Sequence, residues 1–317
     1  DNVEGIVPEF LMMLRGVVDS PDIPLNVSRS GLQADGAVKK ISNYITRKVA
    51  DKLKSLFNEN REDFEQKWND IKIVLEYGML SEPKFYEKAG DFVLYPTTDD
   101  KYFTLSELKE NLKDNQTDKN GKLVVLYASN KDAQHSYIDI AKEKGYQVLL
   151  LDSPIVSHLI QKLEADNENL TFARVDADHI DKLINKEETQ ISKLSDNEKE
   201  TLKTSLEAVV PKAYSVQLES LDSDATPFII TQPEFMRRMK EMSQSGGGGM
   251  FGMSNMPEMY NLVVNANSEL ANSILQANEA TQKELVKNAL DLAKLSQGLL
   301  KGEELTAFVK RSFETLK

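Results

Sequence analysis

The sequence of 317 residues is long enough for two or three domains, and its 40% of apolar residues can fill their cores. Its 51 acidic against 39 basic side chains give a formal net charge of -12, which argues against nucleic acid as the main partner because phosphate backbones are repelled. The absence of cysteine excludes disulfides and thiolate sites, and a mean hydropathy of -0.44 without a long apolar run excludes a membrane span.

The first third of the chain is predicted to be helical. Pro8 can begin a short helix, since its missing N–H costs nothing in the first turn. Apolar residues recur every three or four positions over 37–57 and again over 63–80, which predicts two amphipathic helices. Thr104 and Glu107 have the spacing of a capping box and predict the start of a further short helix.

The middle of the chain alternates between strand and helix patterns. Short apolar strands and helices are predicted in the order 123–127, 131–144, 148–151, 154–165 and 170–175. This alternation is typical of a small α/β unit with a parallel sheet. The charged stretch 186–200 that follows is interpreted as a linker.

The last part of the chain mixes strands and helices. Strands are predicted over 213–221, 228–231 and 261–265, and helices over 196–210, 233–242, 268–276, 281–299 and 303–316. The fold class is therefore α/β, or α+β overall: a helical segment, a small three-layer α/β subdomain and a mixed α+β C-terminal domain. We place the boundaries of four parts at 1–58, 59–118, 119–195 and 196–317.

Catalytic motifs are mostly missing. The run Gly246–Gly249 lacks the Gly-Lys-Ser/Thr of a phosphate-binding loop, and no G-x-G-x-x-G follows the first strand of the α/β unit. His135, His158 and His179 are scattered without metal-ligand spacing, so no metal site is predicted. An enzyme that uses the small α/β unit as a nucleotide or phosphate-sugar site stays open as an alternative.

Three segments near the start of the chain carry a specific resemblance. They are Val7–Leu11 (VPEFL), Arg15–Ser20 (RGVVDS) and Ile23–Arg29 (IPLNVSR). Together they closely resemble the late middle-domain segment of heat-shock protein 90 chaperones of the bacterial HtpG type. The run Leu149–Ile155 looks like a strand and turn of that family's small middle subdomain, and the order of units agrees to the end of the chain.

The resemblance implies an ATP-dependent molecular chaperone of the stress response, cytoplasmic and homodimeric, which binds non-native client proteins. In this family an N-terminal domain holds ATP and Mg²⁺, and a loop of the middle domain completes the ATPase site. The arginine of that loop matches Arg29 and a nearby glutamine matches Gln33, while Asn26 would shape the loop. A guanidinium is always charged and can clamp phosphate oxygens. We expect this chain to lack the ATP-binding domain and to be inactive as an ATPase alone.

The same resemblance assigns a role to each of the four parts. The first is the end of the large middle subdomain with the catalytic loop, and the second is a helical connector. The third is the small α/β middle subdomain, and the fourth is the C-terminal dimerisation domain. Apolar stripes on the last two predicted helices would pair with their copies in a second chain, or pack on their own domain. The predicted dimerisation residues are Leu285, Ala289, Leu292, Leu305, Phe308, Val309, Phe313 and Leu316.

Seven of the ten methionines gather around the glycine-rich loop at 246–249. Methionine is flexible and polarizable and suits surfaces that bind many partners. We therefore predict a partly exposed client-binding surface, with a local core as the alternative, and a plain dimeric scaffold without client binding as a further one. Arg237, Arg238 and Lys240 beside it are expected to attract acidic unfolded chains. The predicted client-binding residues are Phe235, Met236, Met239, Met242, Met250, Phe251, Met253, Met256 and Met259.

Overall fold

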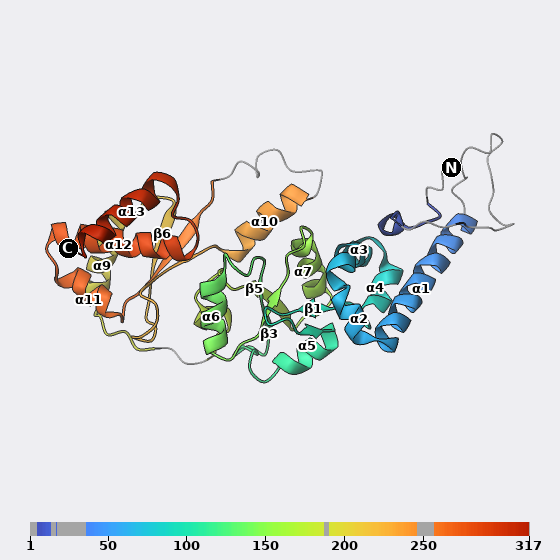
Figure 1. The fold of residues 1–317 in the computed structure, drawn as a ribbon. Helices are drawn as coiled ribbons and strands as arrows, with labels where there is room; N and C mark the ends of the chain where they lie inside the picture. The colour runs from blue at the N-terminus through green and yellow to red at the C-terminus, as the bar shows by residue number, and fades with distance from the viewer. Residues whose placement is uncertain (1–4, 14–16, 18–35, 187–189, 246–256, 317) are drawn as a thin grey trace. The chain divides into compact units, whose positions relative to one another are not determined.

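The computed structural model describes residues 5–13, 17, 36–186, 190–245 and 257–316 (Figure 1). They divide into two compact units, one of residues 1–114 with 149–170 and the other of residues 115–148 with 171–317. Helices and strands are mixed throughout, so the predicted fold class is confirmed. None of the described helices is both long and apolar enough to cross a membrane. The four-part division made from the sequence stays a prediction.

The first unit consists mostly of helices. Its elements are η1 (Glu9–Leu11), α1 (Gly36–Glu59), α2 (Arg61–Gln66), α3 (Trp68–Ser81), α4 (Pro83–Ala89), the antiparallel pair β1 (Tyr95–Pro96) and β2 (Tyr102–Phe103), α5 (Leu105–Leu112) and α7 (Val156–Ala165). Phe85 packs in its core between Phe10, with a tilted ring and centroids 4.8 Å apart, and Phe92, edge-on with centroids 5.8 Å apart. The close packing explains Gly78 on α3, where a Cβ atom would lie 2.7 Å from the Phe10 ring.

Two features of the first unit differ from the sequence prediction. The single helix predicted over 63–80 is two helices, because α2 ends at Gln66 and α3 begins at Trp68. The side chain of Asn60 caps α2, and Phe64 and Trp68 are buried on either side of the break. The capping box of Thr104 and Glu107 is confirmed at the start of α5.

The predicted parallel sheet is present as well. Strands β3 (Leu123–Ala128), β4 (Val148–Leu150) and β5 (Leu170–Arg174) form a parallel sheet in the order β4-β3-β5. Strand β3 is buried along nearly its whole length, as a central strand covered on both faces should be. Helices α6 (His135–Glu143) and α8 (Ile180–Leu183) follow β3 and β5 in the chain.

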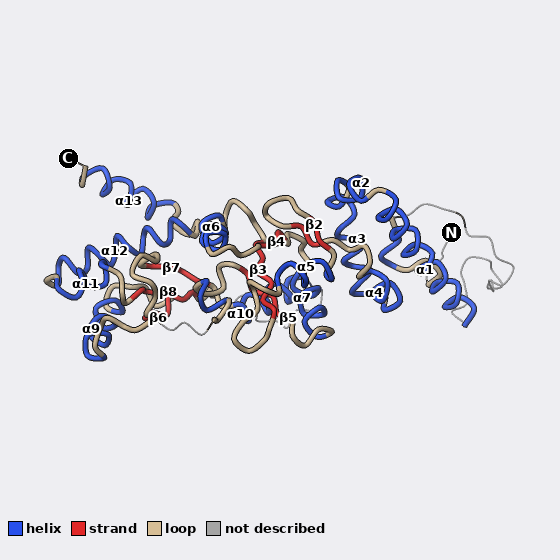
Figure 2. The backbone as a smooth tube through the Cα atoms, turned by 90° about the horizontal axis from the view of Figure 1, so that it is seen from below, coloured by secondary structure: helices blue, strands red, loops and turns tan. Residues whose placement is uncertain are grey.

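The rest of the second unit is built on a mixed sheet (Figure 2). Its elements are α9 (Asp196–Glu207), β6 (Tyr214–Glu219), β7 (Phe228–Thr231), α10 (Glu234–Ser245), β8 (Tyr260–Asn265), α11 (Glu269–Gln276), α12 (Glu279–Ser296) and α13 (Gly302–Glu314). Strand β8 lies in the middle, parallel to β6 and antiparallel to β7.

The two faces of this sheet pack into two different hydrophobic cores. Leu262 and Val264 of β8 pack with α9, α11 and α12, whereas Val263 and Ile229 pack with Tyr137 of α6 and with β3. Because successive strand residues point to opposite faces, one sheet serves both cores.

Glu76 of α3 is a buried carboxylate in the core of the first unit. Its side chain is 6% exposed, and its Oε2 atom has no hydrogen-bond partner within the part of the chain that the structure describes. Burial raises the pKa of Glu76 to about 7, against the lowering effects of a hydrogen bond with Ser153 and the charge of Lys72. The folded unit therefore binds this proton more tightly than the unfolded chain does.

We predict that Glu76→Gln removes a pH dependence of stability. Because the folded pKa exceeds the ordinary value of 4.5, the stabilising protonation is complete below about pH 4.5 and is lost as the pH rises through about 7. The variant should raise the free energy of unfolding by about 2–3 kcal/mol at pH 8 and change it little at pH 4.5. Urea titrations followed by the fluorescence of Trp68, the one tryptophan, measure this. The exposed Glu62→Gln is the control, and an equal effect of Glu76→Gln at both pH values would contradict the assignment.

Candidate functional site

Helix α10 buries a charged side chain and exposes apolar ones. Arg237 is 5% exposed, whereas its neighbours Phe235 and Met236 are 71% and 45% exposed. A surface helix of a globular protein ordinarily turns its apolar stripe to the core and its charges to water. The inversion on α10 therefore marks this helix as a candidate interaction surface.

A cluster of hydrogen-bonded charges holds α10 in this orientation. The Nη2 atom of Arg237 donates to the Tyr127 hydroxyl of β3 at 2.6 Å and to Glu234 at 2.5 Å. Its Nη1 atom donates to both carboxylate oxygens of Glu241, each at 2.7 Å. The guanidinium thus bridges two acids of its own helix to a tyrosine of the central strand.

Strand β5 supplies the other half of the cluster. Arg174 donates to both oxygens of Asp176, at 2.6 and 2.9 Å, and to the side-chain oxygen of Gln232 at 3.0 Å. Its backbone N–H donates to Glu234 at 3.1 Å. Arg238 of α10 also bonds to this strand, because its Nη2 atom donates to the backbone oxygen of Phe172 at 2.6 Å.

The electrostatics of the cluster favour permanent charges rather than proton transfer. Burial acts to raise the pKa of Glu234, but Arg237 and Arg238 outweigh it, so this pKa lies below its ordinary value. Burial also raises the pKa of Tyr127, which keeps the phenol protonated. Glu234 therefore stays ionised and Tyr127 stays protonated near neutral pH, as suits a cluster that anchors a helix.

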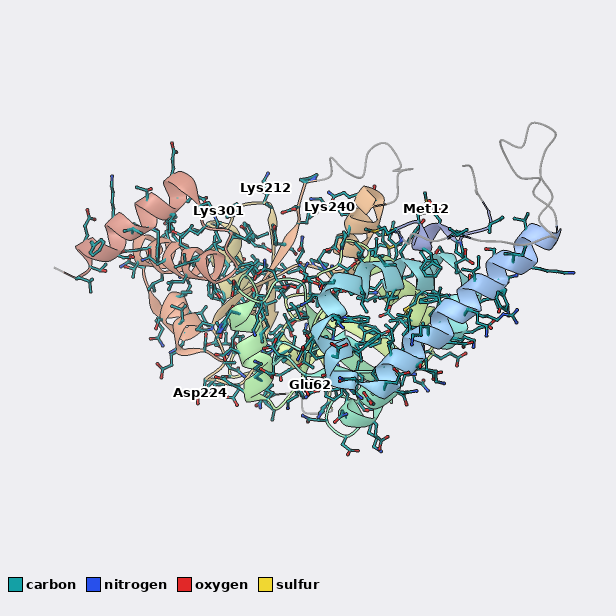
Figure 3. All side chains as sticks on the ribbon, turned by 45° about the vertical axis from the view of Figure 1, so that its right-hand side comes forward. Met12, Glu62, Lys212, Asp224, Lys240 and Lys301 are labelled. Carbon is teal, nitrogen blue, oxygen red and sulfur yellow. The ribbon has the colours of Figure 1, made fainter. Side chains whose placement is uncertain are left out.

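A cavity of about 200 Å³ opens on the outward side of α10. Its apolar lining comes from Phe235, Met236, Met239, Pro257 and Met259. The ion pair of Lys240, labelled in Figure 3, with Glu258 lies at this cavity, with 2.8 Å between Nζ and Oε1. Pockets for drug-sized ligands measure roughly 300–1,000 Å³, so this cavity suits an apolar side chain better than a nucleotide.

The predicted client-binding residues divide into two groups. Phe235, Met236, Met239 and Met259 line the cavity, and Met242 is half-buried on the same helix. Met250, Phe251, Met253 and Met256 lie outside the described residues.

The expectation that Arg237 and Arg238 attract acidic chains is wrong. Both guanidinium groups are already bound to Glu234 of the same helix. The sequence pattern does not predict the anchor itself. Its one local signal is the spacing of Glu234, Arg237 and Glu241 by three and four residues, which places them on one helix face.

A second exposed apolar surface lies on the last two helices and the residues directly after them. Leu292, Val309 and Phe313 are exposed on α12 and α13, and Leu316 is exposed beyond the end of α13, whereas Ala289 is buried in the core of its own domain. The other predicted dimerisation residues are half-buried: Leu285, Leu305 and Phe308. Two ion pairs connect α12 to α13: Lys294 with Glu304, and Asp291 with Arg311.

The predicted catalytic residues Asn26, Arg29 and Gln33 lie outside the described residues. Within the described ranges no group of three or more histidines, aspartates or glutamates could hold a metal ion. His179 has a structural contact, because its Nδ1 atom accepts the backbone N–H of Asp181 and caps α8. Burial lowers the pKa of His179.

Comparison with known proteins decides the family. A family model described as "Hsp90 protein" matches residues 1–317. The chain belongs to the Hsp90 protein family. The resemblance to chaperones of the HtpG type found in the sequence is thereby confirmed.

Several relatives carry the name Chaperone protein HtpG. One from Bacteroides thetaiotaomicron is 49% identical over 284 residues, which cover 88% of this chain and 42% of that protein. One from Porphyromonas gingivalis is 45% identical and covers 96% of this chain and 44% of that protein. One from Bacteroides fragilis is 40% identical, with 100% of this chain and 56% of that protein covered. The chain thus spans about half the length of the curated relatives that it matches.

The anchor of α10 can be tested by removing its central cation. We expect Arg237→Met to lower the free energy of unfolding by about 3 kcal/mol, because Glu241 loses its bidentate partner and the buried Tyr127 and Glu234 lose a donor. Lys240→Met breaks a more exposed pair on the same helix and should cost less than about 1 kcal/mol. Calorimetric unfolding of both variants compares them, and equal losses would show that the cluster is not the anchor.

Proposed function

We propose that the chain is part of a molecular chaperone that binds apolar segments of non-native proteins at the outward side of α10. The observation that carries the proposal is the inversion of this helix, with Phe235 and Met236 in water and Arg237 buried. Exposed apolar surface that the fold itself maintains marks a binding site. The family, and the chaperone name printed for its relatives, support the same function.

The chemistry of the cavity suits many different clients. Thioether side chains such as Met236, Met239 and Met259 adapt to irregular apolar partners because they are unbranched and polarizable. A cavity of about 200 Å³ holds little more than one side chain, so each contact is weak. Weak sites gain affinity when two copies act on one client, because the second contact forms at high effective concentration.

We also propose that the protein is a homodimer formed through α12 and α13. Within the described residues, α13 buries none of its side chains, although it carries Val309 and Phe313. A helix whose apolar stripe is covered only in part needs a partner, and a bundle with the same helices of a second copy supplies one.

For the whole protein we propose ATP hydrolysis with Mg²⁺ in the cytoplasm. The support is the sequence motif around Arg29, whose permanent charge fits phosphate oxygens, together with Gln33 and the loop residue Asn26. ATP would supply the energy for a cycle of client binding and release. The surface on α10 would be the part of this chain that contacts the client.

Client binding is tested by replacing exposed apolar side chains that line the cavity, two on α10 and Met259 just before β8. The variant Phe235→Ser, Met236→Ser and Met259→Ser should suppress the aggregation of a heat-unfolded protein several-fold less well than the parent. Its melting temperature should hardly change, because these side chains are exposed in the folded chain. Met12→Ser with Met13→Ser, exposed elsewhere, is the control. Undiminished suppression by the triple variant would favour a plain scaffold.

Assembly is tested by placing charges on the stripe of the last two helices. Light scattering of the parent should give twice the chain mass of 35.7 kDa. Leu292→Glu with Phe313→Glu should give the single chain mass, because each buried side chain contributes roughly 1.5–3 kcal/mol to the interface. Leu56→Glu on α1 is the control for an exposed leucine outside the stripe. A double variant that stays dimeric would place the interface elsewhere.

A further inference from the structure

The sulfur chemistry of this chain is carried by methionine alone, since it has ten methionines and no cysteine. Among the described residues, Met79 is 3% exposed and packed in the core of the first unit, whereas Met236 and Met259 are 45% and 56% exposed. Met239 is half-buried and lines the same cavity as Met236 and Met259. Three thioethers therefore line one small apolar cavity that water, and small solutes of similar size, can enter.

We propose that Met236, Met239 and Met259 form an oxidation site at which peroxide weakens the binding of apolar client segments. This inference rests on the proposed function of the α10 surface. A thioether sulfur donates an electron pair to hydrogen peroxide, the O–O bond breaks, one oxygen becomes the S=O of a sulfoxide and the other leaves as water. The sulfur loses two electrons and the peroxide gains them. Reduction by two thiols returns the thioether and releases water and a disulfide.

Oxidation changes the property on which the cavity depends. A sulfoxide is polar where a thioether is apolar, so oxidised Met236 or Met259 gives the cavity a dipole that an apolar client side chain leaves unsatisfied. The cavity also contains a hydrogen-bond donor that could satisfy a sulfoxide oxygen. Arg237 lines it, and its buried Nε atom has no hydrogen-bond partner among the described residues, while a sulfoxide oxygen is an acceptor. A sulfoxide oxygen that bonded to this N–H would occupy space that an apolar client side chain otherwise fills.

Exposed methionines outside the cavity provide an internal comparison. Met12 and Met13 are 74% and 84% exposed in the first unit, and Met12 is labelled in Figure 3. They should take up oxygen at least as fast as Met236, because the reaction follows access to the sulfur. Their oxidation should leave client binding unchanged, since neither lines the cavity.

The experiment treats the chain with hydrogen peroxide, maps the added oxygen by peptide mass spectrometry, and measures suppression of aggregation. The parent should lose suppression several-fold as Met236, Met239 and Met259 are oxidised, and a methionine sulfoxide reductase should restore it. The variant Met236→Leu, Met239→Leu and Met259→Leu has no oxidisable sulfur at the cavity. Its suppression after peroxide is compared with its own untreated level, and peroxide should change that level little. The matched variant Met12→Leu with Met13→Leu should stay as sensitive as the parent.

The possible outcomes distinguish failure of the proposed oxidation site from failure of the proposed client binding. Loss of suppression in the peroxide-treated triple leucine variant would place the sensitive residues elsewhere and overturn the assignment. Full suppression by the oxidised parent would overturn the inference and leave the proposed function standing. An untreated parent that suppresses no aggregation would remove both. Circular dichroism of each oxidised sample separates a loss of binding from a loss of fold.

Discussion

The orientation of α10 depends on the bonds between Arg237, Glu234 and Tyr127. Burying an unpaired guanidinium or carboxylate costs several kcal/mol, and hydrogen bonds between the two terminal nitrogens of Arg237, the two acids of its helix and Tyr127 offset this cost. If α10 turned its apolar side to the sheet, the buried Tyr127 hydroxyl would lose its partners on that helix and Arg174 would lose Glu234. The charges therefore keep Phe235 in water against its own preference for the core.

The sheet of β6, β8 and β7 joins this surface to the C-terminal helices. Ile230 packs toward the helical core, and its backbone oxygen accepts the hydroxyl of Tyr137 from α6 at 2.6 Å. Ile229 and Val263 face the other way, into the core with α6 and β3. The strand that anchors Arg237 and the helices proposed to dimerise thus belong to one compact unit. In the proposed dimer, the two α10 surfaces would move with their own C-terminal helices.

Local patterns predicted the regular elements well, because periodicity reflects which face is covered. The helix predicted over 37–57 corresponds to α1 at Gly36–Glu59, and the strand predicted over 228–231 has the same bounds as β7. The hairpin of β1 and β2 escaped prediction, since each strand has two residues and no period to recognise. The anchor of α10 escaped for a different reason. Tyr127 and Arg174 lie far from Glu234 in the chain, so only the folded structure shows why the apolar side of that helix faces water.

The last helix shows how assembly can determine local structure. An isolated helix shorter than roughly 12–15 residues is marginal in water, and α13 has 13 residues, no buried side chain and no side-chain cap at Lys301. Within its own chain the half-buried Leu305 and Phe308 and the pairs Lys294–Glu304 and Asp291–Arg311 hold it, and a pair with a partly exposed member contributes about 1 kcal/mol or less. That is little against the conformational entropy of ordering a helix, which amounts to about 1–2 kcal/mol for each residue. The stability of α13 must therefore come largely from covering its apolar stripe. If a second copy provides the cover, helix formation and dimerisation are a single equilibrium, and the order of α13 rises with the concentration of the chain.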